Sequence, residues 1–155
     1  MDSARQWIER LALQPHPEGG WYREAHRAAA SVQTERGPRS ALTTIYYLLE
    51  QEQLSRWHVV ESDEVWHFYG GAPLELLAYD PRSRALRRTV LGSNAEFIGV
   101  IDTGVWQAAR SLGAYSLVGC TVGPGFEFAD FRFVAAIVGH AEHFAGDLAR
   151  YAALL

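Results

Sequence analysis

The chain has 155 residues, of which 48% are hydrophobic and 21% are charged. These proportions exclude a disordered or fibrous class, and the length predicts one domain over residues 1–155. The formal charge of −4 leaves no basic excess for a phosphate backbone, so we expect no nucleic-acid partner. No apolar run approaches the roughly 20 residues that cross a bilayer. With one cysteine and no targeting pattern, the sequence predicts a cytoplasmic protein without a membrane span.

The first part of the chain predicts a short helix, which Asp2 or Ser3 can cap, followed by a shaped loop with two prolines and two glycines. The stretch after the next strand is small, polar and Gly-Pro-containing, so we expect a mobile surface loop that could fold over a pocket. The elements expected here are a helix over residues 2–13, the shaped loop over 14–20, a strand over 21–27, the mobile loop over 28–40 and a buried strand over 41–49.

The rest of the chain predicts strands of five to nine residues at intervals of roughly ten, separated by turn residues. This spacing is typical of a β-sandwich or barrel, and no alternation of strands with helices appears. The last 16 residues have apolar side chains at steps of three or four and predict a C-terminal helix. The expected strands are two within 57–71, then 73–79, 85–91, 97–101, 105–109, 115–122 and 126–133.

The stretch from Trp57 to Gly71 holds two histidines and three carboxylates. Strand alternation places His58 and Val60 on one face of its first strand. It places Glu64, Trp66 and Phe68 on one face of the second strand, with Val65, His67 and Tyr69 on the other. One face can therefore carry an imidazole beside a carboxylate, while His67 points outward.

This stretch resembles the first motif of the cupin superfamily, G-x5-H-x-H-x(3,4)-E-x6-G. His58, Glu64 and Gly71 stand in register with it, whereas Glu52 replaces the leading glycine and Val60 replaces the second histidine. The second cupin motif, P-x-G-x-x-H, resembles residues 102–107, with Asp102 at the proline position and Gln107 at the histidine position.

Four motifs in order are similar to those of a small single-domain cupin (RmlC-like) subfamily that is mostly of unknown function. They are His16-Pro17-Glu18-Gly19-Gly20-Trp21-Tyr22, Ser62-Asp63-Glu64-Val65-Trp66-His67-Phe68-Tyr69, Gly104-Val105-Trp106-Gln107-Ala108-Ala109 and Val122-Gly123-Pro124-Gly125-Phe126-Glu127-Phe128. The resemblance implies a mainly β fold, the double-stranded β-helix or jelly-roll barrel, with a short N-terminal and a C-terminal helix. It also implies a homodimer and a pocket inside the barrel.

In metal-binding cupins, the matching motif positions converge on one ion, and here they become His58, Val60, Glu64 and Gln107. Valine has no lone pair to donate, and a glutamine amide is a poor ligand for transition metals. The residues therefore predict no metal cofactor, and a divalent metal at His58, Glu64 and Gln107 remains an alternative.

The hypothesis for function is a cupin that binds a small polar organic molecule, with His58 as general base and Glu64 fixing its tautomer. By analogy with metal-independent cupin epimerases, the reaction is an isomerisation or epimerisation of a carbohydrate-like substrate, with Tyr46 or Tyr47 as acid. The rivals are a non-catalytic ligand-binding or storage-like barrel and a degenerate metal-dependent cupin. The predicted substrate-binding residues are Tyr46, Trp66, Phe68, Trp106 and Gln107, while His16 is expected to be a solvated loop residue and Glu127 a structural one.

Overall fold

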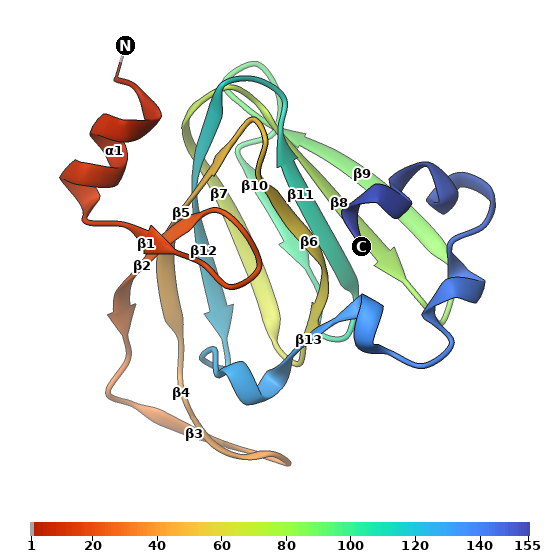
Figure 1. The fold of residues 1–155 in the computed structure, drawn as a ribbon. Coiled ribbons are helices and arrows are strands. Elements are labelled where there is room, and N and C mark those ends of the chain that lie inside the picture. The colour runs from red at the N-terminus through yellow and green to blue at the C-terminus, as the bar shows by residue number, and fades with distance from the viewer. Residues whose placement is uncertain (1) are drawn as a thin grey trace.

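The structure is a computed structural model that describes residues 2–155 (Figure 1). It begins with helix α1 (Ala4–Leu11) and continues almost entirely in strands. The strands are β1 (Gln14–Pro15), β2 (Trp21–Arg27), β3 (Ser31–Thr34), β4 (Gly37–Ser40), β5 (Thr43–Glu50), β6 (Leu54–Val60), β7 (Asp63–Gly71), β8 (Leu74–Asp80), β9 (Ala85–Leu91), β10 (Ile98–Ile101), β11 (Trp106–Ser111), β12 (Tyr115–Gly123) and β13 (Phe131–Phe133). Short 3₁₀ helices are η1 (Phe128–Asp130), η2 (Val134–Ala136), η3 (His140–His143) and η4 (Gly146–Leu154).

Two antiparallel sheets form the barrel (Figure 1). The six-stranded sheet has the order β1-β2-β5-β12-β7-β10, and the five-stranded sheet has the order β13-β6-β11-β8-β9. Chain neighbours such as β5 and β6 therefore belong to different sheets, while β5 pairs with the distant β12. This arrangement confirms the mainly β jelly-roll fold that the sequence predicts.

Strand alternation divides the apolar residues among three layers. Side chains from both sheets meet inside the barrel, where Trp66, Phe68 and Tyr47 are buried. The outer face of the five-stranded sheet packs against the C-terminal segment, and α1 covers part of the outer face of the six-stranded sheet. Trp66 and Phe68 thus share the inner face, and Tyr46 and Tyr47 lie on opposite faces, as alternation predicts.

Both terminal helices are present, and local chemistry explains their ends. Ser3 caps α1, because its side chain accepts the Gln6 backbone N–H while the Gln6 side chain accepts the N–H of Ser3. The C-terminal helix is 3₁₀ rather than α, and its buried residues Leu148, Tyr151 and Leu154 recur at the three-residue period of that helix. No helix among residues 2–155 has the length and apolar character required to cross a membrane.

Two expected elements differ from the structure. Most of the expected loop over 28–40 is the β3–β4 hairpin, which spans residues 31–40. Pro38 argues against a strand in the sequence, but an edge strand tolerates a residue without a backbone N–H. The Arg39 guanidinium makes two hydrogen bonds to the Asp130 carboxylate, which tie this hairpin to η1. The strand expected over 126–133 is interrupted by η1, so only Phe131–Phe133 pairs with β6.

Candidate active site

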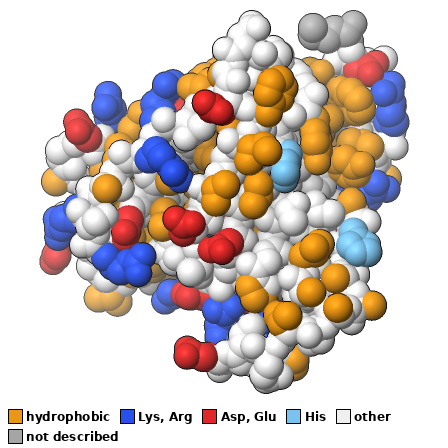
Figure 2. Space-filling view, turned by 180° about the vertical axis from the view of Figure 1, so that it is seen from behind, with side chains coloured by type: hydrophobic (Ala, Val, Ile, Leu, Met, Phe, Trp, Pro, Cys, Tyr) orange, Lys and Arg blue, Asp and Glu red, His pale blue; other side chains and the backbone are white. Residues whose placement is uncertain are grey.

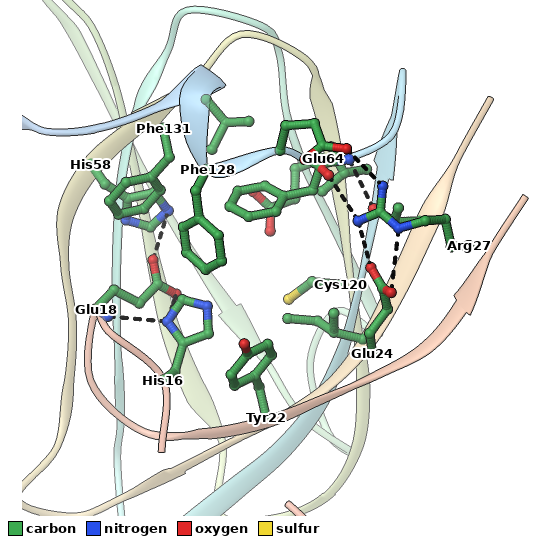
Figure 3. A pocket seen from close by; sticks show the side chains of 16 residues that line it. His16, Glu18, Tyr22, Glu24, Arg27, His58, Glu64, Cys120, Phe128 and Phe131 are labelled. Atoms are coloured by element: carbon green, nitrogen blue, oxygen red, sulfur yellow. Dashed lines mark hydrogen bonds and ion pairs between the residues drawn. The ribbon is translucent and has the colours of Figure 1, made fainter. Parts of the chain in front are cut away.

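A cavity of ≈ 180 Å³ opens between the two sheets, at the end of the barrel that the loop before β2 and the η1 segment cover (Figure 3). Its volume is close to that of the roughly 150 Å³ cavity that holds one benzene molecule. The cavity therefore suits a small ring or a chain of a few carbons. Its lining residues are His16, Glu18, Tyr22, Glu24, Arg27, Thr43, Ile45, His58, Val60, Glu64, Cys120, Val122, Phe126, Glu127, Phe128 and Phe131.

Both residues that the sequence predicts as catalytic, His58 and Glu64, line this cavity. Behind Glu64 lies a buried chain of hydrogen bonds. The Gln107 amide N–H donates to Glu64 Oε2 at 2.7 Å, and the Trp66 indole N–H donates to Gln107 Oε1 at 2.9 Å. Gln107 and Trp66 are each 1% exposed and do not line the cavity, so they orient Glu64 instead of contacting a ligand.

The other predicted wall residues lie outside this cavity. Tyr46 packs near α1 on the outer face of its sheet, and Phe68 lies deeper in the barrel core. Trp106 contacts Tyr79 and Phe144 beneath the C-terminal segment. Strand alternation explains the position of Trp106: because its neighbour Gln107 points inward, the Trp106 side chain points outward. The aromatic wall comes instead from β2 and from residues 126–131.

Glu18, to which the sequence interpretation gave no role, projects into the cavity from the loop between β1 and β2 and is 7% exposed. Gly19 follows it with φ +107°, and a Cβ there would lie 2.2 Å from the Leu54 carbonyl oxygen, so the close approach requires glycine. The Tyr47 hydroxyl donates to the Gly19 carbonyl at 2.6 Å and holds the loop against the barrel. The Glu-Gly-Gly sequence was the signal for this inward turn.

Glu18 lies between the imidazoles of His16 and His58 (Figure 3). Its Oε2 is 3.3 Å from His58 Nε2, and its Oε1 accepts the Ser55 hydroxyl at 3.3 Å. His58 Nδ1 is 2.7 Å from the Arg56 carbonyl oxygen, which can only accept, so Nδ1 carries a proton. The Nε2 lone pair of neutral His58 therefore faces Glu18, and one further proton can be shared by the Glu18–His58 pair.

Burial controls protonation throughout the cavity. It raises the pKa of Glu18 to about 8, against the smaller opposing effect of the neighbouring Tyr47 and Ser55 hydroxyls. It raises the pKa of Glu64 to about 7, which the charge of His58 partly offsets. It also lowers the pKa of His58, against the attraction of Glu64. Near neutral pH the cavity is thus poised to take up or release protons, as acid–base catalysis requires.

The pKa of Glu18 predicts how stability changes with pH. Because its pKa of about 8 in the folded protein exceeds the ordinary 4.5, its contribution to stability is complete below pH 4.5 and is lost as pH rises to 8. Between pH 7 and 8 we expect Glu18 by itself to lower the free energy of unfolding by about 1 kcal/mol per pH unit. When the free energy of unfolding is measured with denaturant and plotted against pH, its slope should be smaller for Glu18→Gln. The slope should be unchanged for Glu35→Gln, an exposed control. A Glu18→Gln profile as steep as that of the wild type would contradict this pKa.

The residues at the implied metal positions do not fit a metal ion. Val60 has no donor atom, and both ends of the Gln107 amide are already hydrogen-bonded to Trp66 and Glu64. Within residues 2–155, no group of three or more His, Cys, Asp or Glu side chains is arranged to hold a metal.

Comparisons with known proteins match the fold. A family model described as "Cupin superfamily (DUF985)" matches residues 5–134. A hypothetical protein from Leishmania major is 36% identical over 84% of this chain and 86% of its own, with a TM-score of 0.78. A protein from Shewanella oneidensis is 29% identical over 92% of this chain and 93% of its own, with a TM-score of 0.81.

A third solved structure shares the fold alone. It is a dTDP sugar isomerase from Desulfovibrio desulfuricans, 13% identical over 83% of this chain and 90% of its own, with a TM-score of 0.57. No curated protein matches the chain.

Proposed function

Because the chain belongs to the cupin superfamily, in the family described as DUF985, we propose that it is a metal-independent isomerase or epimerase of a small carbohydrate-like molecule. The observation that carries the proposal is the Glu18–His58 pair, whose Oε2 and Nε2 atoms lie 3.3 Å apart in the cavity, where they can share a proton. Such a pair can remove a proton from a carbon of the substrate and return it. The proposal is compatible with the existence of a sugar isomerase that has the same fold.

The remaining lining residues have roles that suit this chemistry. Glu64, held by Gln107, is a second acid–base group on the same cavity wall. The Tyr22 hydroxyl points into the cavity and is a candidate acid in place of Tyr46 or Tyr47 (Figure 3). The rings of Phe128 and Phe131 give the cavity an apolar wall beside the reacting groups.

Proton exchange with solvent tests the proposal even while the product is unidentified. A panel of small sugars and hydroxyketones is incubated with the protein in D₂O, and NMR detects deuterium that enters a carbon position. We expect exchange in at least one compound, at a rate that His58→Ala abolishes without unfolding the protein. A compound that binds saturably but never exchanges would instead support a ligand-binding barrel and overturn the proposal.

We also propose that the protein is a homodimer. Large apolar side chains are exposed on β7 and β10, at the part of the six-stranded sheet that α1 does not cover: Tyr69 is 54% exposed and Ile98 is 54% exposed. Seen from behind, the surface shows hydrophobic side chains gathered among charged ones (Figure 2). Exposed apolar side chains that gather on one face of a sheet are typical of protein contacts.

Sedimentation velocity tests the dimer. We expect the wild type to sediment as a dimer and the variant Ile98→Arg as a monomer, because an arginine would be buried without a partner in the contact. The control Val32→Arg, on the β3–β4 hairpin, should leave the dimer intact. A wild-type protein that remains monomeric at every concentration would rule the dimer out.

A further inference from the structure

The backbone of the loop between β1 and β2 fixes the tautomer of His16. The backbone N–H of Glu18 donates a hydrogen bond to His16 Nδ1 at 3.1 Å. Because an N–H can only donate, Nδ1 carries a lone pair, and in the neutral ring the proton is on Nε2. His16 and His58 are therefore opposite tautomers: His58 presents a lone pair at Nε2, and His16 presents an N–H there.

The Nε2–H of His16 faces open cavity space. The His16 side chain is 7% exposed, and within residues 2–155 its only hydrogen bond is the one at Nδ1. Its second ring nitrogen points toward the space beside Phe128 (Figure 3). The rings of Tyr22, at 4.4 Å, and Tyr47, at 5.5 Å, pack edge-on against the imidazole and hold its orientation. An N–H that is held in one orientation and faces the cavity without a protein acceptor can donate to an acceptor atom of a ligand.

His16 stays neutral over the working range of pH. Burial, with a smaller effect from neighbouring His58, lowers its pKa to about 4. A neutral imidazole has no charge to attract an anion. Its N–H can still donate a hydrogen bond and polarise a carbonyl group. The cavity thus has a donor for an uncharged oxygen.

The charges at the cavity opening disfavour an anionic ligand. Arg27 is the one arginine or lysine among the lining residues of the described chain. Its guanidinium already donates to the carboxylates of Glu24 and Glu127 and to the Phe126 carbonyl oxygen. A carboxylate or phosphate entering the cavity would meet these two carboxylates without a free cation to balance it.

We infer that His16 is a catalytic hydrogen-bond donor to the carbonyl oxygen of the substrate, which makes the substrate an uncharged aldehyde or ketone with a hydrogen on the adjacent carbon. This inference rests on the proposed function. The deprotonated form of the Glu18–His58 pair takes the proton from that carbon onto the Glu18 carboxylate, the C–H electrons form a C=C bond, and the C=O π electrons move onto the oxygen. His16 Nε2–H stabilises this enolate oxygen, and a proton returned to carbon or oxygen completes the isomerisation.

The tautomer is tested first, on the wild-type protein without ligand. Two-dimensional ¹H–¹⁵N NMR that correlates ring nitrogens with ring carbon-bound protons distinguishes the two neutral tautomers. We expect His16 to be protonated at Nε2 and His58 at Nδ1 at pH 7. Protonation of His16 at Nδ1 would overturn the inference and leave the Glu18–His58 pair untouched.

The donor is then tested with cyclohexanone as probe, against methylenecyclohexane, which has the same shape and no acceptor oxygen. We expect cyclohexanone to bind roughly three- to tenfold more tightly, the effect of one hydrogen bond. Infrared spectroscopy of carbonyl-labelled cyclohexanone should show the C=O stretch of the bound probe shifted to lower frequency.

Variants separate donation from a structural role. His16→Phe should lose both the tighter binding of cyclohexanone and the infrared shift. His16→Gln should keep both, because its amide N–H replaces Nε2–H. The control His26→Gln, at an exposed position of β2, should match the wild type. A shift that persists in folded His16→Phe would overturn the inference. If His16→Phe does not fold, the tautomer of the wild-type protein and the infrared spectrum of His16→Gln still test whether His16 donates the hydrogen bond. Loss of deuterium exchange with the shift retained would count against the proposed function alone.

Discussion

Glu18→Gln is expected to reduce deuterium exchange by about 10²- to 10⁴-fold, the usual contribution of one general acid–base group. Glutamine keeps the shape of the side chain and can still accept the Ser55 hydroxyl, but it cannot take up a proton. The loss should therefore appear in turnover, with little change in the free energy of unfolding near pH 7. The measurement is the initial rate of exchange by NMR, with circular dichroism to verify the fold.

Combination with His58→Gln sharpens this prediction. If Glu18 and His58 act as one unit, the exchange rate of the double variant should equal that of the slower single variant. Glu35→Gln, on the β3–β4 hairpin, is the matched control and should be fully active. Full activity in Glu18→Gln, or losses that multiply in the double variant, would show that the two residues do not share the proton.

Gly19→Ala is expected to be among the most destabilising single substitutions in the loop that carries Glu18. The residue has φ +107°, and an added Cβ would lie 2.2 Å from the Leu54 carbonyl oxygen, so the loop must move. Its carbonyl would then lose the Tyr47 hydroxyl, and Glu18 would leave His58.

Gly104→Ala is the matched control, because Gly104 also has a positive φ, +76°, but has open space where a Cβ would lie. It should cost only the backbone strain, about 1–2 kcal/mol. We expect Gly19→Ala to cost at least about 2 kcal/mol more in denaturant unfolding, since it adds a collision to that strain. If both variants lose the same free energy of unfolding, the loop can move without cost and does not hold Glu18 in place.

The barrel and half of the candidate site could be predicted from the sequence, because they depend on local patterns. Alternation along β7 placed Glu64 and Trp66 on the inner face, and the motif register identified His58 and Glu64, which both line the cavity. The same alternation argued against Trp106 and Gln107 in one pocket, since adjacent strand residues face opposite ways.

Glu18 and His16 could not be placed in the same manner. They stand 40 and 42 residues from His58, and only the inward turn at Gly19 and the pairing of β2 with β5 bring them to it. A loop histidine between prolines has no periodic pattern that predicts its burial. Its tautomer depends on one backbone N–H, which is visible only in three dimensions. The aromatic wall was missed because η1 interrupts a strand that residue propensities favour.

The most direct test of the central claim is the titration of the Glu18 carboxyl in the folded wild-type protein, followed by NMR of side chains labelled with ¹³C at the carboxyl carbon. Acid–base action of the Glu18–His58 pair requires a carboxyl that can both bind and release its proton near neutral pH, so we predict a midpoint near pH 8. Its resonance can be assigned by its absence from Glu18→Gln. A Glu18 carboxyl that titrates near its ordinary value of 4.5 in the folded protein would contradict the shared proton and, with it, the acid–base function.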